Sequence, residues 1–160
     1  GAFVLSVDKT FPAGQEAFIS YGDLTNLDTL SDYGFISEDN PCNTESLVVK
    51  VIRHPSVGVI VDCEGGINMD AIAKLRESVA NMYGQESKGD DLYLQPVSDS
   101  NEEEVFSFLA SFLKEAVDES QTGAKIAQGD QLVMTYLNER AKTLQKGINV
   151  IEEKFPGLEY

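Results

Sequence analysis

Side chains that bind metal ions or act as nucleophiles are scarce in this sequence. The 160 residues include one histidine, His54, and two cysteines, Cys42 and Cys63, which lack the CxxC spacing of zinc sites. Because structural zinc is held by about four histidine or cysteine ligands, we expect no metal site. We interpret both thiols as reduced and structural rather than disulfide-bonded, and His54, beside Pro55, as a solvated loop residue.

Positive charge is also scarce. Lysine and arginine total 12 against 27 aspartate and glutamate residues, which gives a formal net charge of -15. Because affinity for nucleic acid comes chiefly from cationic side chains that neutralise phosphates, the composition argues against a nucleic-acid partner. The acidic residues are spread along the chain, which favours solubility and suits a basic or mixed-charge protein substrate.

Long hydrophobic runs are missing. No apolar stretch approaches the roughly 20 residues that span a bilayer. The first residues, GAFVLSVDKTFPAG, lack the basic region and apolar core of a secretion signal. We therefore expect no membrane partner and a soluble intracellular protein, without a choice among cytoplasm, nucleus and plastid. The chain also begins inside a predicted strand, as an excised domain does.

The first third of the chain contains short stretches typical of β-strands. Residues 3–7 and 17–21 are apolar segments on either side of a turn marked by proline and glycine. Residues 47–53 and 57–62, LVVKVIR and VGVIVD, are rich in β-branched side chains and are separated by a short polar connection. The simplest interpretation of the second pair is a β-hairpin.

Two helices are predicted in the first half of the sequence. Thr25 or Asn26 can cap a short helix that Gly34 ends, and Asn68 can cap a longer one that Gly84 ends. Apolar residues at spacings of three and four identify the inner face of each helix. These residues are Leu24, Leu27 and Leu30 in the first and Ile72, Leu75, Val79 and Met82 in the second.

Two further helices follow a connection at residues 85–98. Ser100 and Glu103 form an S-x-x-E capping box at the start of the third helix, and residues 119–130 interrupt the pattern before the fourth. The expected buried stripe of the third helix is Phe106, Leu109, Leu113 and Val117, flanked by Phe108 and Phe112. The fourth carries a continuous apolar seam of Leu137, Ala141, Leu144, Ile148, Ile151 and Phe155.

Together these elements predict an α+β fold in which a β-rich segment and a hairpin precede a helical lobe. The seam of the fourth helix fits an intramolecular core better than a dimer interface, so we expect a monomer, with dimerisation through this seam as the alternative. The carboxylates Glu102 to Glu104 lie at a helix start, where the helix dipole favours them, rather than in a metal or acid-base pair. EGG at residues 64–66 lacks the remainder of a phosphate loop and is interpreted as a turn.

One stretch has a more specific pattern. AGQEAFISYGDLTNLDTLSDYGFISEDNP, residues 13–41, resembles the C-terminal end of the SET domain in protein methyltransferases of the Rubisco large-subunit methyltransferase class. That class has a Gly-Glu/Gln pair, an apolar strand, a Tyr-Gly, an Asn, a leucine-bearing helical turn, a Tyr-Gly-Phe and an Asn-Pro in the same order. The resemblance implies that residues 1–41 are an incomplete SET segment. It also implies that residues 42–160 are a hairpin plus a helical lobe like the substrate-binding lobe of that class.

The resemblance implies roles for four residues. Tyr21 matches the catalytic tyrosine that lines the methyl-transfer channel and helps to hold the target amine in line with the methyl group of S-adenosylmethionine. Tyr33 and Phe35 match the aromatic pair near this cofactor, with Phe35 the better candidate to pack on the adenine. Asn26 matches an asparagine that braces the loop. From the residues alone, a strand-end tyrosine is the favoured interpretation of Tyr21, and the resemblance reverses that preference. Core packing of a short helix is the alternative for Tyr33 and Phe35, and both roles are compatible.

The early Gly-x-Gly strand and the Asn-His-Ser/Cys segment of this family are absent from the 160 residues. The resemblance therefore implies a fragment of a protein-lysine N-methyltransferase that alone neither binds S-adenosylmethionine well nor transfers a methyl group. The alternative is a non-catalytic helical protein-binding module that keeps a remnant of SET.

Overall fold

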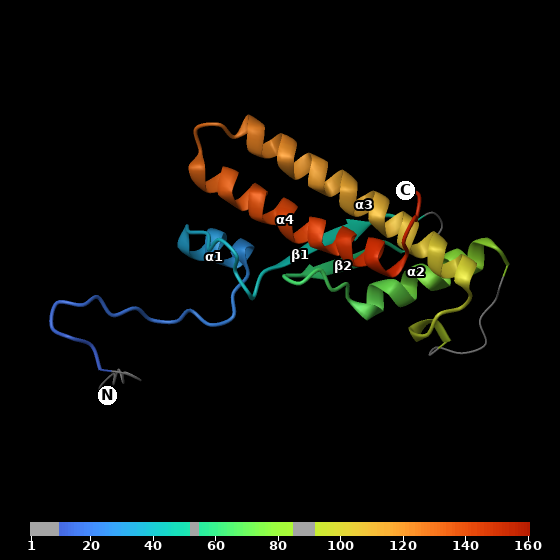
Figure 1. Cartoon of the computed structure of the whole chain (residues 1–160), viewed down its shortest axis with the longest axis horizontal. Helices are drawn as coiled ribbons and strands as arrows, with labels where there is room; N and C mark the ends of the chain where they lie inside the picture. The colour runs from blue at the N-terminus through green and yellow to red at the C-terminus, as the bar shows by residue number, and fades with distance from the viewer. Residues whose placement is uncertain (1–9, 52–54, 85–91) are drawn as a thin grey trace.

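A computed structural model describes residues 10–51, 55–84 and 92–160 of the chain. Its helices pack beside a two-stranded antiparallel sheet, which confirms the predicted α+β fold (Figure 1). In chain order the elements are α1 (Asn26–Tyr33), β1 (Thr44–Val49), β2 (Val57–Asp62), α2 (Met69–Met82), the 3-10 helix η1 (Leu92–Leu94), α3 (Asp99–Ile126) and α4 (Gln131–Lys154). The predicted strand at residues 3–7 and the position of His54 lie outside the described residues.

The predicted hairpin is confirmed. β1 and β2 pair antiparallel with Thr44 opposite Asp62 and Val49 opposite Val57, so β1 begins three residues earlier than the pattern indicated. Strict alternation along β2 buries Val57, Val59 and Val61 and exposes the residues between them. The hairpin thus presents one valine-rich face to the helices.

Asn68 precedes α2 as predicted, but its side chain bonds to β2 instead of capping the helix. Its Oδ1 accepts from the backbone N–H of Ile60 at 2.8 Å, and its Nδ2 donates to the carbonyl of Gly58 at 3.3 Å. The predicted inner face is buried at Ile72, Leu75 and Val79. Met82 was expected there as well, and this was wrong: it is 56% exposed, because it lines a surface hollow with Val51 and Phe108 that is open to solvent.

The start and end of α3 both differ from the prediction. Ser98, not Ser100, is the N-cap, and its Oγ accepts from the backbone N–H of Asn101 at 3.2 Å. The helix then continues through residues 119–126, where a break was expected. Ser120 and Ala124 are buried there against α4, and Gly123 lies where an added Cβ would be 3.1 Å from Leu137. Packing between the two helices therefore overrides the weak local helix propensity.

Glu102 lies in the first turn of α3, the helix start predicted for this acidic run, and its side chain is also buried in the core. Its two oxygens accept from Nε and Nη2 of Arg76 at 2.5 and 2.7 Å, and both side chains are almost fully buried. Arg76 Nη1 donates to the carbonyl of Tyr93 at 3.1 Å. This bidentate pair joins α2, η1 and α3.

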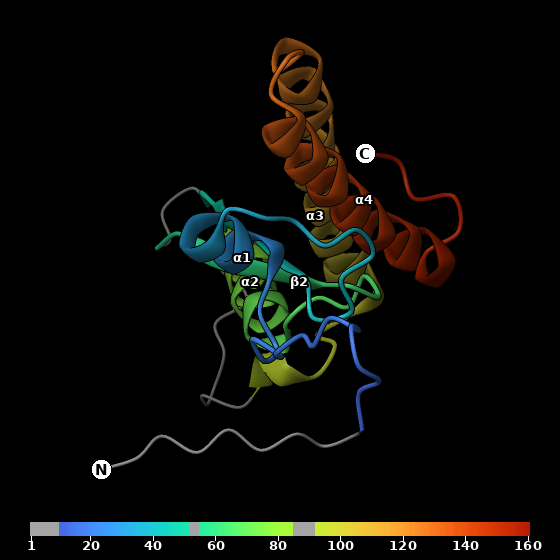
Figure 2. The same ribbon diagram turned by 90° about the vertical axis from the view of Figure 1, so that its left-hand side faces the viewer.

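The predicted stripes of α3 and α4 form the centre of the core. α4 runs back beside α3, and Figure 2 shows their connected ends standing clear of the other elements. The seam of α4 lies inside the molecule because it packs against α3 and the hairpin. Its buried members are Ala141, Leu144, Ile148 and Ile151, which join Phe106, Leu109, Leu113 and Val117 of α3.

The strand expected at residues 17–21 is absent, and that prediction was wrong. Residues 10–24 form no regular element and extend away from the helices in Figure 1. Phe18 and Ile19 are 79% and 70% exposed. A strand needs a hydrogen-bonding neighbour, and among the described residues none pairs with this segment.

Candidate functional site

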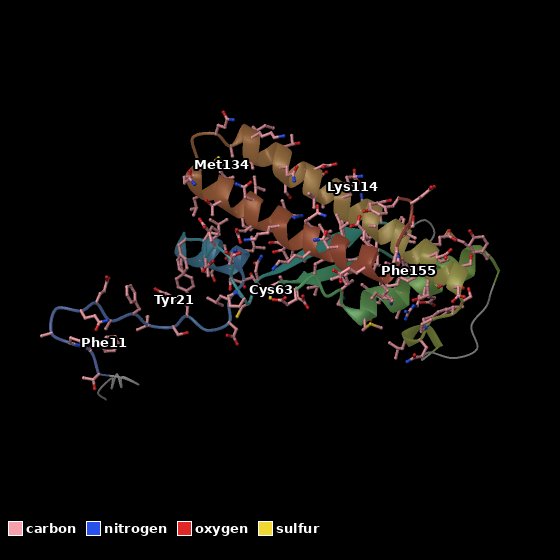
Figure 3. The ribbon with its side chains drawn as sticks, in the orientation of Figure 1. Phe11, Tyr21, Cys63, Lys114, Met134 and Phe155 are labelled. Carbon is pink, nitrogen blue, oxygen red and sulfur yellow. The ribbon has the colours of Figure 1, made fainter. Side chains whose placement is uncertain are left out.

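Three aromatic side chains that the sequence singled out come together beside α1. The ring centroids of Tyr21 and Tyr33 are 4.4 Å apart, and that of Phe35 is 5.9 Å from Tyr21 and 6.3 Å from Tyr33. All three are partly exposed, at 48%, 50% and 38%. We call this group the aromatic cluster. Figure 3 shows Tyr21 where the extended segment reaches α1.

The caps of α1 determine where these rings lie. Thr25 accepts from the backbone N–H of Asp28, and the Asp28 carboxylate accepts from the Thr25 backbone N–H at 3.0 Å, a complete capping box. The Thr25 hydroxyl, which donates to the Asp28 carboxylate at 2.7 Å, and the Thr25 backbone N–H hold the pKa of this carboxyl below its ordinary value. At the other end Gly34 takes a left-handed conformation with φ of 72°. This conformation turns the chain so that Phe35 returns toward Tyr33.

Asn26 lies beneath the cluster and is fully buried. Its backbone N–H donates to Asn43 Oδ1 at 3.0 Å, and its side-chain Oδ1 accepts from Asn40 Nδ2 at 3.2 Å and from the Ser37 N–H at 3.3 Å. Its own Nδ2 is buried without a hydrogen-bond partner among the described residues. Asn26 therefore ties α1 to the loop that follows it, whereas Leu27, expected on the inner face, is 51% exposed.

The polar contacts continue from α1 to α4. Asn43 Nδ2 donates to Thr143 Oγ1 at 3.1 Å and lies 3.4 Å from Glu45 Oε1. Burial raises the pKa of the Glu45 carboxyl, an effect that the Arg140 charge and the Asn43 hydrogen bond partly oppose. Arg140 is only loosely paired, with Nη1 3.9 Å from the Glu45 carboxylate. We call Asn26, Asn40, Asn43, Thr143 and Glu45 the asparagine network.

The sequence did not identify Asn40, Asn43 or Thr143 as part of a site. The Asn-Pro pair at Asn40 was used only as part of the family pattern, and Thr143 is 100 residues from Asn43. Both asparagine side chains lie in a polar loop, where such residues bond to nearby backbone groups. A capped helix that begins with an asparagine and is followed by a loop with two more is the signal that could have indicated the network.

Both cysteines lie close to this region as free thiols. Cys63 Sγ donates to the Pro41 carbonyl at 2.8 Å, and Cys42 Sγ is 3.6 Å from the Asp23 carboxylate. Burial and the Asp23 charge raise the pKa of the Cys42 thiol. Because the thiolate is the nucleophile, these surroundings disfavour Cys42 as a reactive group.

The chemistry available at the aromatic cluster is that of flat apolar faces and phenol hydroxyls. Rings of this kind can pack on a planar heterocycle or line a passage for an alkyl chain, and a phenol can accept from or donate to an amine. In the part of the chain that the structure describes, no group of three metal-binding side chains gathers. The same residues include no helix both long and apolar enough to cross a bilayer.

A scan against models of known protein families finds no match to this chain, and a search of curated proteins finds no significantly similar sequence. Function must therefore be inferred from the side chains and their arrangement.

Proposed function

We propose that this chain contributes the catalytic-tyrosine segment and the substrate-recognition lobe of an S-adenosylmethionine-dependent protein-lysine N-methyltransferase of the SET type. The observation that carries the proposal is the aromatic cluster. Tyr21, Tyr33 and Phe35, which the sequence resemblance assigned to one site, lie with ring centroids 4.4 to 6.3 Å apart. The capping box fixes the start of α1, which carries Tyr33, and Asn26 joins α1 to the loop that follows Phe35 through the Ser37 N–H.

In this proposal the protein acts mainly by positioning. Transfer of a methyl group from a sulfonium to an amine requires a neutral amine whose lone pair points along the breaking bond, and orientation accounts for most of the rate. The Tyr21 hydroxyl would accept from the lysine amine and hold that direction, while its ring lines the passage for the alkyl chain. Tyr33 and Phe35 offer partly exposed faces that fit the adenine of S-adenosylmethionine, which supplies the methyl group when bound.

The remaining lobe would recognise the protein substrate, and the excess of carboxylates favours a basic or mixed-charge target. A soluble intracellular location, in cytoplasm, nucleus or plastid, belongs to the same proposal.

The direct test is Tyr21→Phe in the complete protein, with methyl transfer from S-adenosylmethionine to its substrate as the readout. We expect the turnover number to fall about 100-fold, the scale of a small loss of alignment in the reacting groups. Tyr33→Phe is the matched control, because it also removes one phenol oxygen from the cluster and should leave turnover close to wild type. Equal turnover in the Tyr21→Phe and wild-type proteins would remove Tyr21 from the mechanism.

A second candidate function is a non-catalytic helical protein-binding module that keeps a remnant of SET. The observation that favours it is the fold itself, in which α2, α3 and α4 make up most of the described structure. The two candidates differ in cofactor binding by the complete protein. Calorimetric titration with S-adenosylmethionine should release heat for the enzyme and none for the binding module, and Phe35→Ala should weaken that binding.

A further inference from the structure

A surface hollow lies between β1 and the middle of α3, on a different part of the molecule from the aromatic cluster. Phe112 and Ala116 of α3 and Leu47 of β1 line it with apolar atoms, and Val48 of β1, which also lines it, is 70% exposed. Phe112 packs on Phe108 with ring centroids 5.1 Å apart. We call this hollow the β1–α3 groove.

The groove runs along an open edge of the sheet. Consecutive residues of a strand point to opposite faces, and yet Leu47 and Val48 both line the groove, so it must lie at the edge of β1 rather than over one face. Among the described strands β1 pairs with β2 alone, and so its other edge has no partner there. Free backbone groups along such an edge can pair with an added strand.

The α3 side of the groove is acidic. Glu115 and Glu119 line it and are both exposed, and neither forms an ion pair with a described residue. Among the described residues that line the groove, Lys50 of the segment after β1 is the one cation. The local charge therefore favours a cationic ligand.

The two carboxylates lie one helical turn apart, about 6 Å along the axis of α3. Figure 1 shows α3 crossing the direction of β1, so a strand added to β1 would pass beneath the two carboxylates at an angle. Both carboxylates line the same hollow as Leu47 and Val48 of β1.

We propose that the β1–α3 groove binds an extended basic peptide segment by strand addition to β1. Lysine or arginine side chains of the segment pair with Glu115 and Glu119, and its apolar side chains contact Val48. This inference stands apart from methyl transfer, because it requires neither the aromatic cluster nor a cofactor.

The test uses the 160-residue chain and a fluorescein-labelled ten-residue peptide of alternating lysine and valine, with binding measured by fluorescence anisotropy at low salt. Glu115→Gln combined with Glu119→Gln should weaken binding about fivefold or more, as expected for the loss of two exposed ion pairs. Asp118→Asn is the matched control, because this exposed carboxylate is on the same helix but does not line the groove. Lys50→Gln should strengthen binding.

Two modified peptides separate strand addition from general attraction. A peptide with alternate backbone nitrogens methylated keeps its charges but loses donors to β1, and we expect it to bind more weakly than the parent. A glutamate-valine peptide should not bind. Equal affinity for the double glutamine variant and the Asp118→Asn control would overturn the proposal, as would equal affinity for the methylated and parent peptides. A doubling of mass in light scattering, abolished by Val48→Ser, would assign the groove to a second copy of this chain and also overturn it.

Discussion

Buried charged side chains contribute differently to the free energy of folding, depending on how closely they contact a partner of opposite charge. Arg76 and Glu102 form a buried pair with two short hydrogen bonds, whereas Glu45 is equally buried but faces Arg140 at 3.9 Å. Removing both carboxylates from water costs free energy of folding. Only Glu102 offsets this cost, because its contacts with Arg76 are short and directed. Neutralising the carboxylate should therefore lower the free energy of unfolding at Glu102 and raise it at Glu45 as the pH increases.

Replacement of Glu102 by Gln should lower the free energy of unfolding by about 3–5 kcal/mol, because Arg76 is left buried without its counter-charge. Urea denaturation measures this change, with the exposed neighbour Glu103→Gln as control. Arg76→Met combined with Glu102→Leu should recover most of the loss, since no charge then remains in the core. Equal effects of Glu102→Gln and Glu103→Gln would show that the pair is not buried.

Replacement of Glu45 by Gln should change how stability depends on pH. The folded-state pKa of Glu45 is raised above its ordinary value of 4.5, so the folded protein holds this proton more tightly than the unfolded chain. The wild-type contribution is therefore full below pH 4.5 and is lost as pH rises through the folded pKa. Because glutamine does not titrate, the free energy of unfolding of Glu45→Gln should rise relative to wild type from pH 4 to pH 7. Urea denaturation of both proteins across this pH range measures the difference, with Glu153→Gln at an exposed position as the control. The same pH dependence in Glu45→Gln and wild type would contradict the prediction.

At the scale of elements, close backbone contact fixes the turn after β2 against α4. The turn expected at EGG is confirmed, with the Gly65 N–H donating to the Asp62 carbonyl at 3.0 Å. Gly65 has φ of 92°, and an added Cβ would lie 2.5 Å from the backbone oxygen of Lys146 in α4. Lys146 Nζ in turn donates to the Cys63 carbonyl at 2.6 Å.

Gly65→Ala should therefore lower the free energy of unfolding by about 2 kcal/mol or more, the sum of left-handed strain and a displaced helix. Gly84→Ala is the matched control: its φ is 69° but its Cβ would meet nothing within 4 Å, so only strain of about 1 kcal/mol applies. Urea denaturation compares the two. Equal losses would mean that α4 moves aside without cost.

Local patterns predicted most elements but not the contacts between distant ones. β-branched runs indicated the hairpin, and apolar spacing indicated the inner faces of α3 and α4, because these signals depend on residues close in sequence. The continuation of α3 past residue 119 depends on burial of Ser120 and Ala124 against α4, which no local pattern contains. The residues of the site also divide into those that local sequence predicts and those that it does not. Tyr21, Tyr33 and Phe35 were named from one short stretch, whereas Thr143 is 100 residues from Asn43, its partner in the asparagine network.

At the scale of the whole molecule, net charge and exposed apolar surface have opposite effects on association between copies of the chain. The formal charge of -15 keeps copies apart at neutral pH, while Phe18 and Ile19 stand exposed in an unpaired segment. Such a segment readily pairs with its equivalent in another chain once repulsion is removed. Association should thus depend strongly on pH.

Turbidity should be greatest near pH 4.2, the isoelectric point from the sequence, and Phe18→Ser combined with Ile19→Ser should reduce it there. Met82→Ser, which removes a side chain that is 56% exposed on α2, is the control and should have a smaller effect. Turbidity unchanged by the double serine variant would exclude residues 18 and 19 as the cause.

The pairing of α3 with α4 has a consequence for synthesis on the ribosome. The valines of the hairpin are synthesised before α2, α3 and α4, the helices whose apolar faces join them in the core. The four-residue connection between α3 and α4 closes at little entropic cost, so these two helices can pair as soon as both are synthesised. Until then only α2, which follows the hairpin directly, offers it an apolar face. Part of the valine-rich surface must therefore stay in water from the synthesis of the hairpin until that of α4, the helix that completes its cover.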